Sequence, residues 1–197
     1  MGNDRTDKRR LARTLARAVL RILGWQIEGT APTIAKYVLI GAPHTSNWDF
    51  IIALLAKGAL DLRFRWIGKD TLFHWPFGGF MRWLGGIPVN RRTHNNFIDQ
   101  MVEQFRTHEE LVIVITPEGT RKRTESWKSG FYYIARGAQV PIVLGFVDYG
   151  RKRLGIGPAV MPSGDLELDL APIRSFYADK SGKHPEQKGE VRIFPRD

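Results

Sequence analysis

The chain has 197 residues, of which 43% are hydrophobic and 25% are charged. This length suits a single domain, and this composition excludes a wholly disordered chain. Cysteine is absent, which excludes disulfide scaffolds, cysteine-ligated metal sites and cysteine nucleophiles. The 30 Lys and Arg residues exceed the 20 Asp and Glu residues, and the net charge of +10 favours polyanionic partners such as nucleic acid, an anionic membrane or phosphorylated substrates.

The N-terminal region, residues 1–24, is predicted to be a basic amphipathic helix that precedes a domain formed by residues 25–197. A helical period places apolar residues on one face and arginines on the opposite face: Leu11, Leu15, Ala18, Val19 and Ile22 against Arg10, Arg13, Arg17 and Arg21. Helices of this kind lie in the interface of anionic membranes, and they also occur as solvated helices packed on a domain. Both interpretations stay open.

Beyond this helix, short apolar strands alternate with helical segments. Strands are predicted at residues 37–41, 64–67, 111–116, 140–146 and 191–194, and helices at 46–57, 95–106 and 126–136. The alternation predicts a single-domain α/β fold with a largely parallel, mixed sheet and helices on both faces. Residues 179–189 are predicted to form a polar loop. No apolar run approaches the ~20 residues of a membrane span, so no transmembrane helix is expected.

Ionisable side chains follow the first of these strands, where α/β sheets place their ligands. His44 comes directly after strand 37–41, and Asp49 lies five residues further on, in the first turn of the next helix. The carboxylate can reach back to one ring nitrogen and leave the other to act as a general base. A purely structural role is the alternative, with Asp49 stabilising the helix N-terminus and His44 filling a turn.

A second polar segment, residues 116–121, follows strand 111–116. Pro117 and Gly119 mark a turn that exposes backbone N–H groups and directs Glu118 and Arg121 outward. A guanidinium beside turn amides suits a phosphate, because its planar fork bonds two oxygens at once. A surface turn with an ion pair is the simpler interpretation of this segment alone.

Together the two segments resemble the glycerolipid acyltransferase family, whose best-known members are 1-acyl-sn-glycerol-3-phosphate (lysophosphatidic acid) acyltransferases. The resemblance rests on a His-x4-Asp motif at His44 and Asp49 and on Pro-Glu-Gly-Thr-Arg about seventy residues later. It extends over roughly residues 37–147. Further blocks also fit the family: its lysine block at 68–72, its glycine-to-arginine block at 86–91, its Lys-x-Gly at 128–130 and its fourth block at 140–143.

The resemblance implies an acyltransferase that moves a fatty acyl group from acyl-CoA or acyl-carrier protein to a lysophospholipid, without a cofactor or a metal. The expected acceptor is 1-acyl-sn-glycerol-3-phosphate, while glycerol 3-phosphate or another lysolipid stays open. His44 and Asp49 are the implied catalytic pair, and the backbone amides at the start of the following helix are candidates to stabilise the oxyanion. The implied substrate-binding residues are Lys69, Arg91, Glu118, Gly119, Thr120 and Arg121.

Aromatic residues are concentrated between positions 64 and 83. The seven are Phe64, Trp66, Phe73, Trp75, Phe77, Phe80 and Trp83. Plain core packing, a membrane-facing lip and an acyl-chain tunnel each explain such a cluster. With the basic N-terminal helix, it leads us to expect a peripheral protein on the cytoplasmic face of a membrane, in contact with anionic lipid.

Two other function classes are considered. A nucleic-acid-binding protein would explain the positive charge and the aromatics interleaved with arginine, but the charge is scattered and no such motif is recognised, so we expect no nucleic-acid partner. A metal-dependent hydrolase would use His44, Asp49 and Glu118 as ligands, with His74 as the only nearby further histidine.

Overall fold

A mixed β-sheet forms the centre of the computed structural model, which describes residues 2–89 and 97–194. Within these residues the sheet has seven strands in the order β1-β7-β6-β2-β5-β3-β4. Neighbouring strands are parallel except for β6 and β7, which are antiparallel. The strands are β1 (Gln26–Glu28), β2 (Lys36–Ala42), β3 (Phe64–Lys69), β4 (Gly86–Val89), β5 (Leu111–Ile115), β6 (Ile142–Asp148) and β7 (Arg153–Val160).

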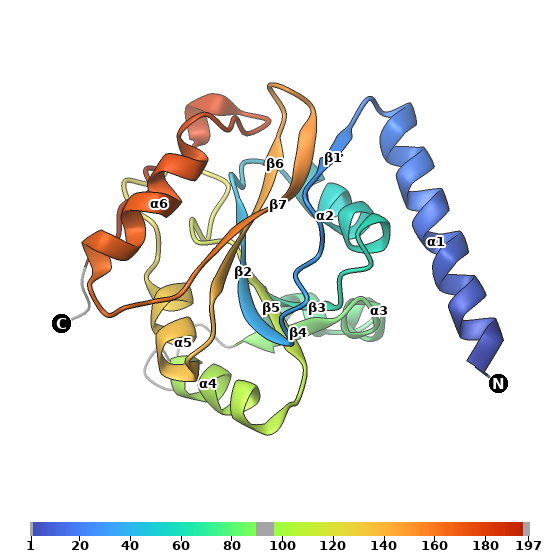
Figure 1. Cartoon of the computed structure of the whole chain (residues 1–197), viewed down its shortest axis with the longest axis horizontal. Coiled ribbons are helices and arrows are strands. Elements are labelled where there is room, and N and C mark those ends of the chain that lie inside the picture. Colours follow the sequence, from blue (N-terminus) through green and yellow to red (C-terminus); the bar gives the residue numbers. More distant parts are fainter. Residues whose placement is uncertain (1, 90–96, 195–197) are drawn as a thin grey trace.

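Helices cover both faces of this sheet (Figure 1). One face carries α4 (Phe97–Thr107), α5 (Gly130–Ala138) and α6 (Leu166–Ala178). The other carries α1 (Gly2–Ile22), α2 (Trp48–Ala59) and α3 (Gly78–Trp83), and short 3-10 turns occur at η1 (Asp70–Phe73) and η3 (Pro185–Gln187). The predicted α/β fold with a largely parallel sheet is therefore confirmed. Among the described residues, no helix combines the length and the apolar character needed to cross a bilayer.

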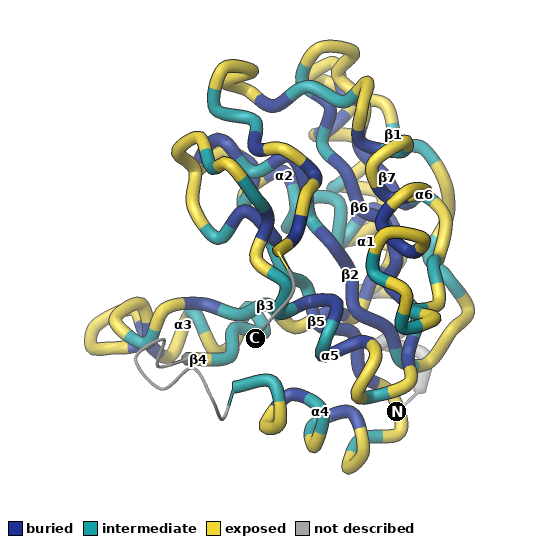
Figure 2. The backbone as a smooth tube through the Cα atoms, turned by 90° about the vertical axis from the view of Figure 1, so that its left-hand side faces the viewer, coloured by how far each residue is buried: buried dark blue, intermediate teal, exposed yellow. Residues whose placement is uncertain are grey.

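The central strands consist largely of buried residues (Figure 2), and their side chains enter apolar clusters on both faces of the sheet. In β2, Val38 and Ile40 are fully buried in the cluster that also includes side chains of α4, α5 and α6. Tyr37 and Leu39 point to the opposite face, where they join a second apolar cluster. Strands covered on both sides read as continuous apolar runs rather than alternating ones, which is why the sequence revealed β2, β5 and β6 clearly.

Helix α1 packs on α2, and it does so through the face that the sequence marks as polar. Leu20 is fully buried in a cluster with Trp25, Ile52, Ala59 and Leu154. The predicted apolar stripe points the other way, with Leu11, Leu15, Val19 and Ile22 all exposed. The amphipathic pattern of α1 therefore does not describe its packing within the chain.

The aromatic segment between positions 64 and 83 divides into two groups. Phe64 and Phe73 are buried, and Trp66 packs against Phe73 with ring centroids 5.7 Å apart. The other four side chains are exposed: Trp75, Phe77, Phe80 and Trp83. Core packing explains the first group but not the second.

Strand β7 and helix α6 were not predicted. A Cβ atom added to Gly155 would lie 1.9 Å from the backbone oxygen of Glu28 in β1, and one added to Gly157 would lie 2.4 Å from the Phe176 ring in α6. These glycines permit close packing, but they also lower the strand propensity of the segment. Helix α6 contains Pro172, which similarly obscures its helical pattern.

The strand predicted at residues 191–194 is wrong. Val191 and Ile193 are buried in the core cluster that also contains side chains of α5 and α6, but the segment has no partner strand within the described sheet. The Trp127 amide donates to the Arg192 carbonyl at 2.7 Å, and the Arg174 guanidinium donates to the Val191 carbonyl at 3.2 Å. The alternating apolar residues thus serve an extended segment that packs on helices. The helix predicted from 126 begins later, at Gly130.

Candidate active site

Loops that leave three adjacent parallel strands meet at one edge of the sheet. β2 lies between β5 and β6, with Ile40 opposite Ile115 and Ala42 opposite Phe146. The carboxyl ends of these strands therefore coincide, and each is followed within three residues by a polar side chain: His44 after β2, Glu118 after β5 and Tyr149 after β6. This is the edge at which open α/β sheets bind their ligands.

His44 and Asp49 form a hydrogen-bonded pair at this edge. The Nδ1 atom of His44 lies 3.1 Å from Oδ2 of Asp49, which belongs to the first turn of α2. Because an ionised carboxylate only accepts hydrogen bonds, Nδ1 carries the proton and Nε2 has a free lone pair. The His44 side chain keeps 20% of its surface exposed, so the imidazole is accessible to a substrate while Asp49 is buried.

The Asp49 carboxylate is held by four donors. Its Oδ2 also accepts the backbone N–H groups of Thr45 and Ser46, each at 2.9 Å, and its Oδ1 accepts the hydroxyl of Tyr149 at 2.8 Å. Burial raises the pKa of Asp49, but the hydrogen bonds from His44, Ser46 and Tyr149 together lower it by a larger amount. The net pKa therefore lies below the ordinary value. Asp49 is therefore an anion that can stabilise a protonated His44.

Glu118 fastens the second motif to the first. Its Oε1 accepts the backbone N–H of His44 at 3.1 Å, and only 2% of the residue is exposed. The other oxygen, Oε2, is buried and has no hydrogen-bond partner among the described residues. Burial raises the pKa of Glu118 to about 7, although the His44 N–H opposes the shift. Glu118 thus positions the loop of His44 and is protonated in part near neutral pH.

The turn that carries Glu118 also brings Arg121 to the loop of His44. Gly119 has a positive φ of 64°, and a Cβ atom there would lie 2.9 Å from the Lys128 side chain. The Arg121 guanidinium donates to the side-chain oxygen of Asn47, and Thr120 accepts the N–H of Lys122 at 3.2 Å. An exposed guanidinium therefore lies beside the segment that bears His44 and Asp49.

The other two predicted substrate-binding residues are not brought to this cluster by the described contacts. Lys69 is exposed at the end of β3, which β5 separates from β2. No hydrogen bond or ion pair within residues 2–89 and 97–194 joins Lys69 to His44 or Asp49. Arg91 lies outside the described residues, so its proposed role remains a prediction.

Sequence reasoning missed Tyr149 and the contribution of residues 179–189. The usable signal for Tyr149 was its place directly after a buried strand, which it shares with His44 and Glu118. The segment 179–189 lies against the His44 loop, because the His184 N–H donates to Thr45 Oγ1 at 3.1 Å and the Lys183 ammonium sits 5.2 Å from the centre of the Trp48 ring. No motif in the sequence indicated this contact.

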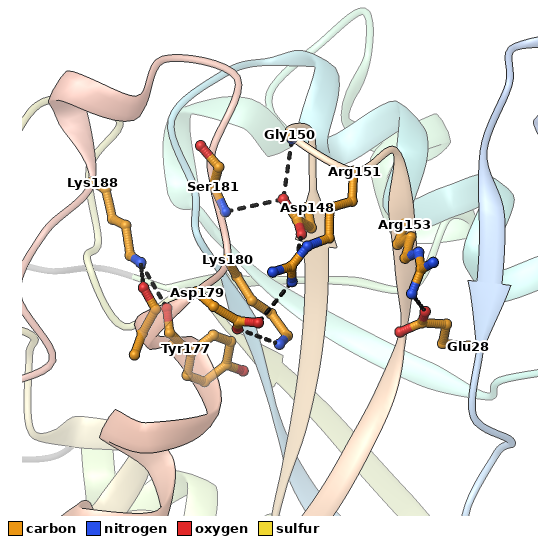
Figure 3. A network of polar contacts seen from close by, with 11 residues as sticks. Glu28, Asp148, Gly150, Arg151, Arg153, Tyr177, Asp179, Lys180, Ser181 and Lys188 are labelled. Carbon is orange, nitrogen blue, oxygen red and sulfur yellow. Dashed lines mark hydrogen bonds and ion pairs between the residues drawn. The ribbon is translucent and has the colours of Figure 1, made fainter.

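Asp148 anchors the same C-terminal segment to the end of β6 (Figure 3). Its Oδ1 accepts the N–H groups of Gly150 and Ser181, both at 3.1 Å, and its Oδ2 lies 3.7 Å from Arg151. The backbone N–H of Tyr149 then donates to the Ser181 carbonyl at 2.8 Å. The C-terminal segment and the end of β6 are thereby fixed together beside the site.

The described residues offer no ligand set for a metal ion. Nowhere in that part of the chain do three His, Asp or Glu side chains gather closely enough to hold one. His44, Asp49 and Glu118 are engaged with one another through a side-chain hydrogen bond and a backbone hydrogen bond instead. The metal-hydrolase interpretation therefore finds no support in the described site.

Comparisons with known proteins identify the family of this chain and the class of its fold. A family model described as Acyltransferase matches residues 26–143, a span that contains both motifs and more than half of the chain. The fold is similar to the crystal structure of the 1-acyl-sn-glycerophosphate (LPA) acyltransferase PlsC from Thermotoga maritima, with a TM-score of 0.60 and 18% identity over 88% of this chain and 79% of that one. None of the curated protein sequences matches the chain significantly.

Proposed function

Since the chain belongs to the Acyltransferase family and is an acyltransferase, we propose that it transfers a fatty acyl group from an acyl thioester to a hydroxyl of a lysophospholipid. The proposed acceptor is 1-acyl-sn-glycerol-3-phosphate, which would give phosphatidic acid. The observation that carries the proposal is the pair of His44 and Asp49, 3.1 Å apart, at the sheet edge and beside an exposed arginine.

In the proposed reaction His44 acts as the general base. Its Nε2 takes the proton of the acceptor hydroxyl while the hydroxyl oxygen attacks the thioester carbonyl carbon. The tetrahedral intermediate collapses, the carbon–sulfur bond breaks, and the thiolate takes the proton from the imidazolium. Because a thioester is already activated, no acyl-enzyme is needed, and Asp49 stabilises the imidazolium as in a catalytic triad that lacks its nucleophile.

Two of the backbone amides that precede α2 are engaged with Asp49, so they leave the oxyanion to other donors. The N–H groups of Thr45 and Ser46, at the approach to α2, both donate to Asp49 Oδ2 at 2.9 Å. These two amides hold the carboxylate of the His44–Asp49 pair in place and are not available to a substrate oxygen. Their engagement explains why Asp49 lies so close to His44, since the loop folds around the carboxylate.

The position of Arg121 supports the proposal that the acceptor is phosphorylated. Its guanidinium is exposed and is directed to Asn47, three residues from His44. A guanidinium fork matches the oxygens of a phosphate, and the net charge of +10 adds a long-range attraction for anionic substrates. Glycerol 3-phosphate carries the same phosphate, so the acceptor has to be identified by experiment.

The exposed stripe of α1 supports peripheral contact with an anionic membrane surface. Leu11, Leu15, Val19 and Ile22 are exposed and lie outside the buried cluster through which α1 packs on α2. Such a helix can insert its apolar face at the headgroup level while the arginines bind anionic lipid. A water-insoluble acceptor would then be taken directly from the surface in which it resides.

The proposed function is tested by product analysis. The purified protein is incubated with labelled acyl-CoA or acyl-carrier protein and, separately, with lysophosphatidic acid, glycerol 3-phosphate, lysophosphatidylcholine and monoacylglycerol. We expect labelled phosphatidic acid from the first acceptor, little product from the last two, and no loss of activity with EDTA. Faster acylation of glycerol 3-phosphate would replace the acceptor and keep the chemistry, whereas no acylation of any acceptor would contradict the proposal.

A further inference from the structure

The carboxylate of Asp49 has a side-chain partner that lies beyond the region matched by the family model. That region ends at residue 143, whereas the Tyr149 hydroxyl donates to Asp49 Oδ1 at 2.8 Å. His44, Thr45 and Ser46 all bond to the other oxygen, Oδ2. Within the described hydrogen bonds Tyr149 is thus the donor that holds Oδ1.

We propose that Tyr149 is a positioning residue for acyl transfer. It holds the carboxylate of Asp49 in the plane in which this carboxylate can bind His44 and stabilise its protonated form. The inference rests on the proposed general-base role of His44. Tyr149 itself does not touch the reacting atoms in this account, because its hydroxyl is directed to Asp49.

The physical reason lies in the freedom of an aspartate side chain. The terminal torsion of aspartate has a broad, nearly two-fold profile, so the backbone of α2 alone does not fix the plane of the carboxylate. A donor on each oxygen does fix it, and hydrogen bonds to an ionised acceptor are about twice as strong as neutral ones. Without Tyr149, Oδ1 would be left in a buried setting without its side-chain donor, and the carboxylate would turn or admit water.

Tyr149 is itself held from several sides, as a positioning group must be. Its ring packs edge-to-face on Trp25, with centroids 5.0 Å apart, and Trp25 is buried beside Leu20 of α1. Its backbone N–H donates to Ser181, and the preceding Asp148 binds two further N–H groups (Figure 3). The hydroxyl is therefore delivered to Asp49 by a fixed ring on a fixed strand end.

The protonation state of Tyr149 suits this role. Burial raises its pKa well above the ordinary value, and the hydrogen bond to Asp49 raises it further. The hydroxyl therefore keeps its proton and remains a donor over the whole range in which an acyltransferase is assayed.

The chain contains a matched control for the loss of such a bond. Tyr132 of α5 donates its hydroxyl to the buried Asp169 of α6 at 2.8 Å, and Asp169 likewise accepts a backbone N–H, from Ser163, at 2.8 Å. This pair has the same chemistry but lies between two helices and contributes no group to the site. Tyr132→Phe therefore reports the cost of losing a tyrosine–aspartate hydrogen bond as such.

The test compares Tyr149→Phe with Tyr132→Phe by melting temperature and by steady-state kinetics with both substrates. We expect both variants to fold and to melt a few degrees below the wild type. Only Tyr149→Phe should lower kcat, by roughly 10-fold, with KM for acceptor and donor changed less than about twofold. A kcat of Tyr149→Phe within twofold of the wild type, or an equal fall of kcat in both variants, would overturn the inference.

A pH profile adds a readout that a packing role would not move. The titratable groups that face Asp49 are His44, Tyr149 and Glu118. The Tyr149 hydroxyl draws negative charge from Asp49, so without it Asp49 should bind the imidazolium of His44 more strongly. The acid limb of kcat/KM, which reports protonation of the base, should therefore move to higher pH in Tyr149→Phe and stay in place in Tyr132→Phe. An unmoved limb in Tyr149→Phe would count against positioning.

His44→Ala, assayed in parallel, separates the two levels of the argument. If His44→Ala loses activity and Tyr149→Phe keeps it, the general-base proposal stands and the positioning role fails. If His44→Ala remains active, the general-base proposal fails, and the positioning role that rests on it fails with it.

Discussion

Two regions of the molecule depart in opposite directions from the usual rule that polar side chains are outside and apolar ones inside. At the carboxyl edge of β2, β5 and β6, the side chains of Thr45, Ser46, Asp49 and Glu118 are buried. On α1 and around α3, large apolar side chains are exposed instead, among them Ile22 at 84% and Trp75 at 94%. Scattered exposed apolar residues are normal, but clusters of them on one helix or segment are not.

The comparison shows that folding alone explains neither region. Buried polar groups cost stability unless they form hydrogen bonds. Most of the buried polar groups at the sheet edge do form them, and several of these bonds hold His44 or its partner Asp49. Exposed apolar groups gain nothing from the fold, yet those on α1 share one face of the helix. We propose the first region as the reaction site and the second as a surface for lipid. Four experiments test this contrast.

The largest effect is expected at the sheet edge. His44→Ala removes the base, and general-base loss typically costs ~10² to 10⁴ in rate, so kcat should fall by that factor while the melting temperature changes little. Asp49→Ala should lower kcat similarly, but it also leaves the amides of Thr45 and Ser46 without their acceptor, and it should be less stable. Acyl transfer and thermal unfolding of both variants measure this. Retention of more than about a tenth of kcat by His44→Ala would refute the assignment of the base.

The exposed stripe of α1 should give the next largest effect. The double variant Leu11→Glu and Ile22→Glu alters two exposed side chains, so its melting temperature should match the wild type. Binding to anionic liposomes, measured by sedimentation, should weaken by roughly 100-fold or more, because each of the two inserted aliphatic side chains contributes about 1.5 kcal/mol or more.

Leu20→Ala is the matched control on the same helix. Leu20 is fully buried, so its truncation should lower stability and leave liposome binding intact. Deleting residues 1–24 would be less informative, since it would also uncover the cluster around Trp25 and Ile52. Unchanged binding by the double variant would move the membrane contact to the exposed aromatics near α3.

A smaller effect is expected from Arg121→Lys. The change keeps the positive charge but loses the planar fork, so KM for the phosphorylated acceptor should rise about 10-fold, the scale of one charge-assisted hydrogen bond. KM for the acyl donor should change little. Monoacylglycerol serves as the control acceptor, on which wild type and variant should be equally poor. An equal loss on both acceptors would make Arg121 structural or donor-binding.

The smallest effect concerns the pH dependence of stability. The pKa of Glu118 is raised from 4.5 to about 7 in the folded protein, so its contribution to stability is present below pH 4.5 and is lost as the pH rises through 7. Glu118→Gln can still accept the His44 N–H but cannot ionise. Between pH 5 and 8 its melting temperature should fall less than that of the wild type, by at least about 2–4 °C, which is the scale of 1 kcal/mol in a domain of this size. Parallel falls in both proteins would show that Glu118 does not titrate in this range.

Local sequence spacing predicted the contact between His44 and Asp49 but not the contacts that Tyr149 and residues 179–189 make with them and their loop. His44 and Asp49 are five residues apart on a strand end and a helix start, so their contact follows from the local geometry. Glu118 became recognisable through its motif. The Tyr149 contact spans 100 positions, and its existence depends on β6 lying next to β2, which no local pattern reveals.

The fold was predictable where burial is two-sided and obscured where close packing needs glycine or proline. β2, β5 and β6 read as apolar runs, whereas β7 carries Gly155 and Gly157 to admit β1 and α6. The pattern of α1 predicted a helix correctly but not its packing face. Buried Leu20 provides part of the contact, and the Arg17 guanidinium donates to the Ala59 carbonyl at 3.0 Å. A hydrophobic stripe shows that one face of a helix is apolar, not that another part of the chain covers it.

The hydrogen bond from the His44 backbone to Glu118 has a consequence for protein engineering. It joins two motifs that lie 74 positions apart, because the loop after β2 is hydrogen-bonded to the turn after β5. A chimaera that takes only one of the two loops from a relative would pair a backbone amide with a carboxyl group from a different evolutionary history. Exchanges of substrate preference between relatives should therefore move both loops as a cassette, together with the strand pair that sets their register.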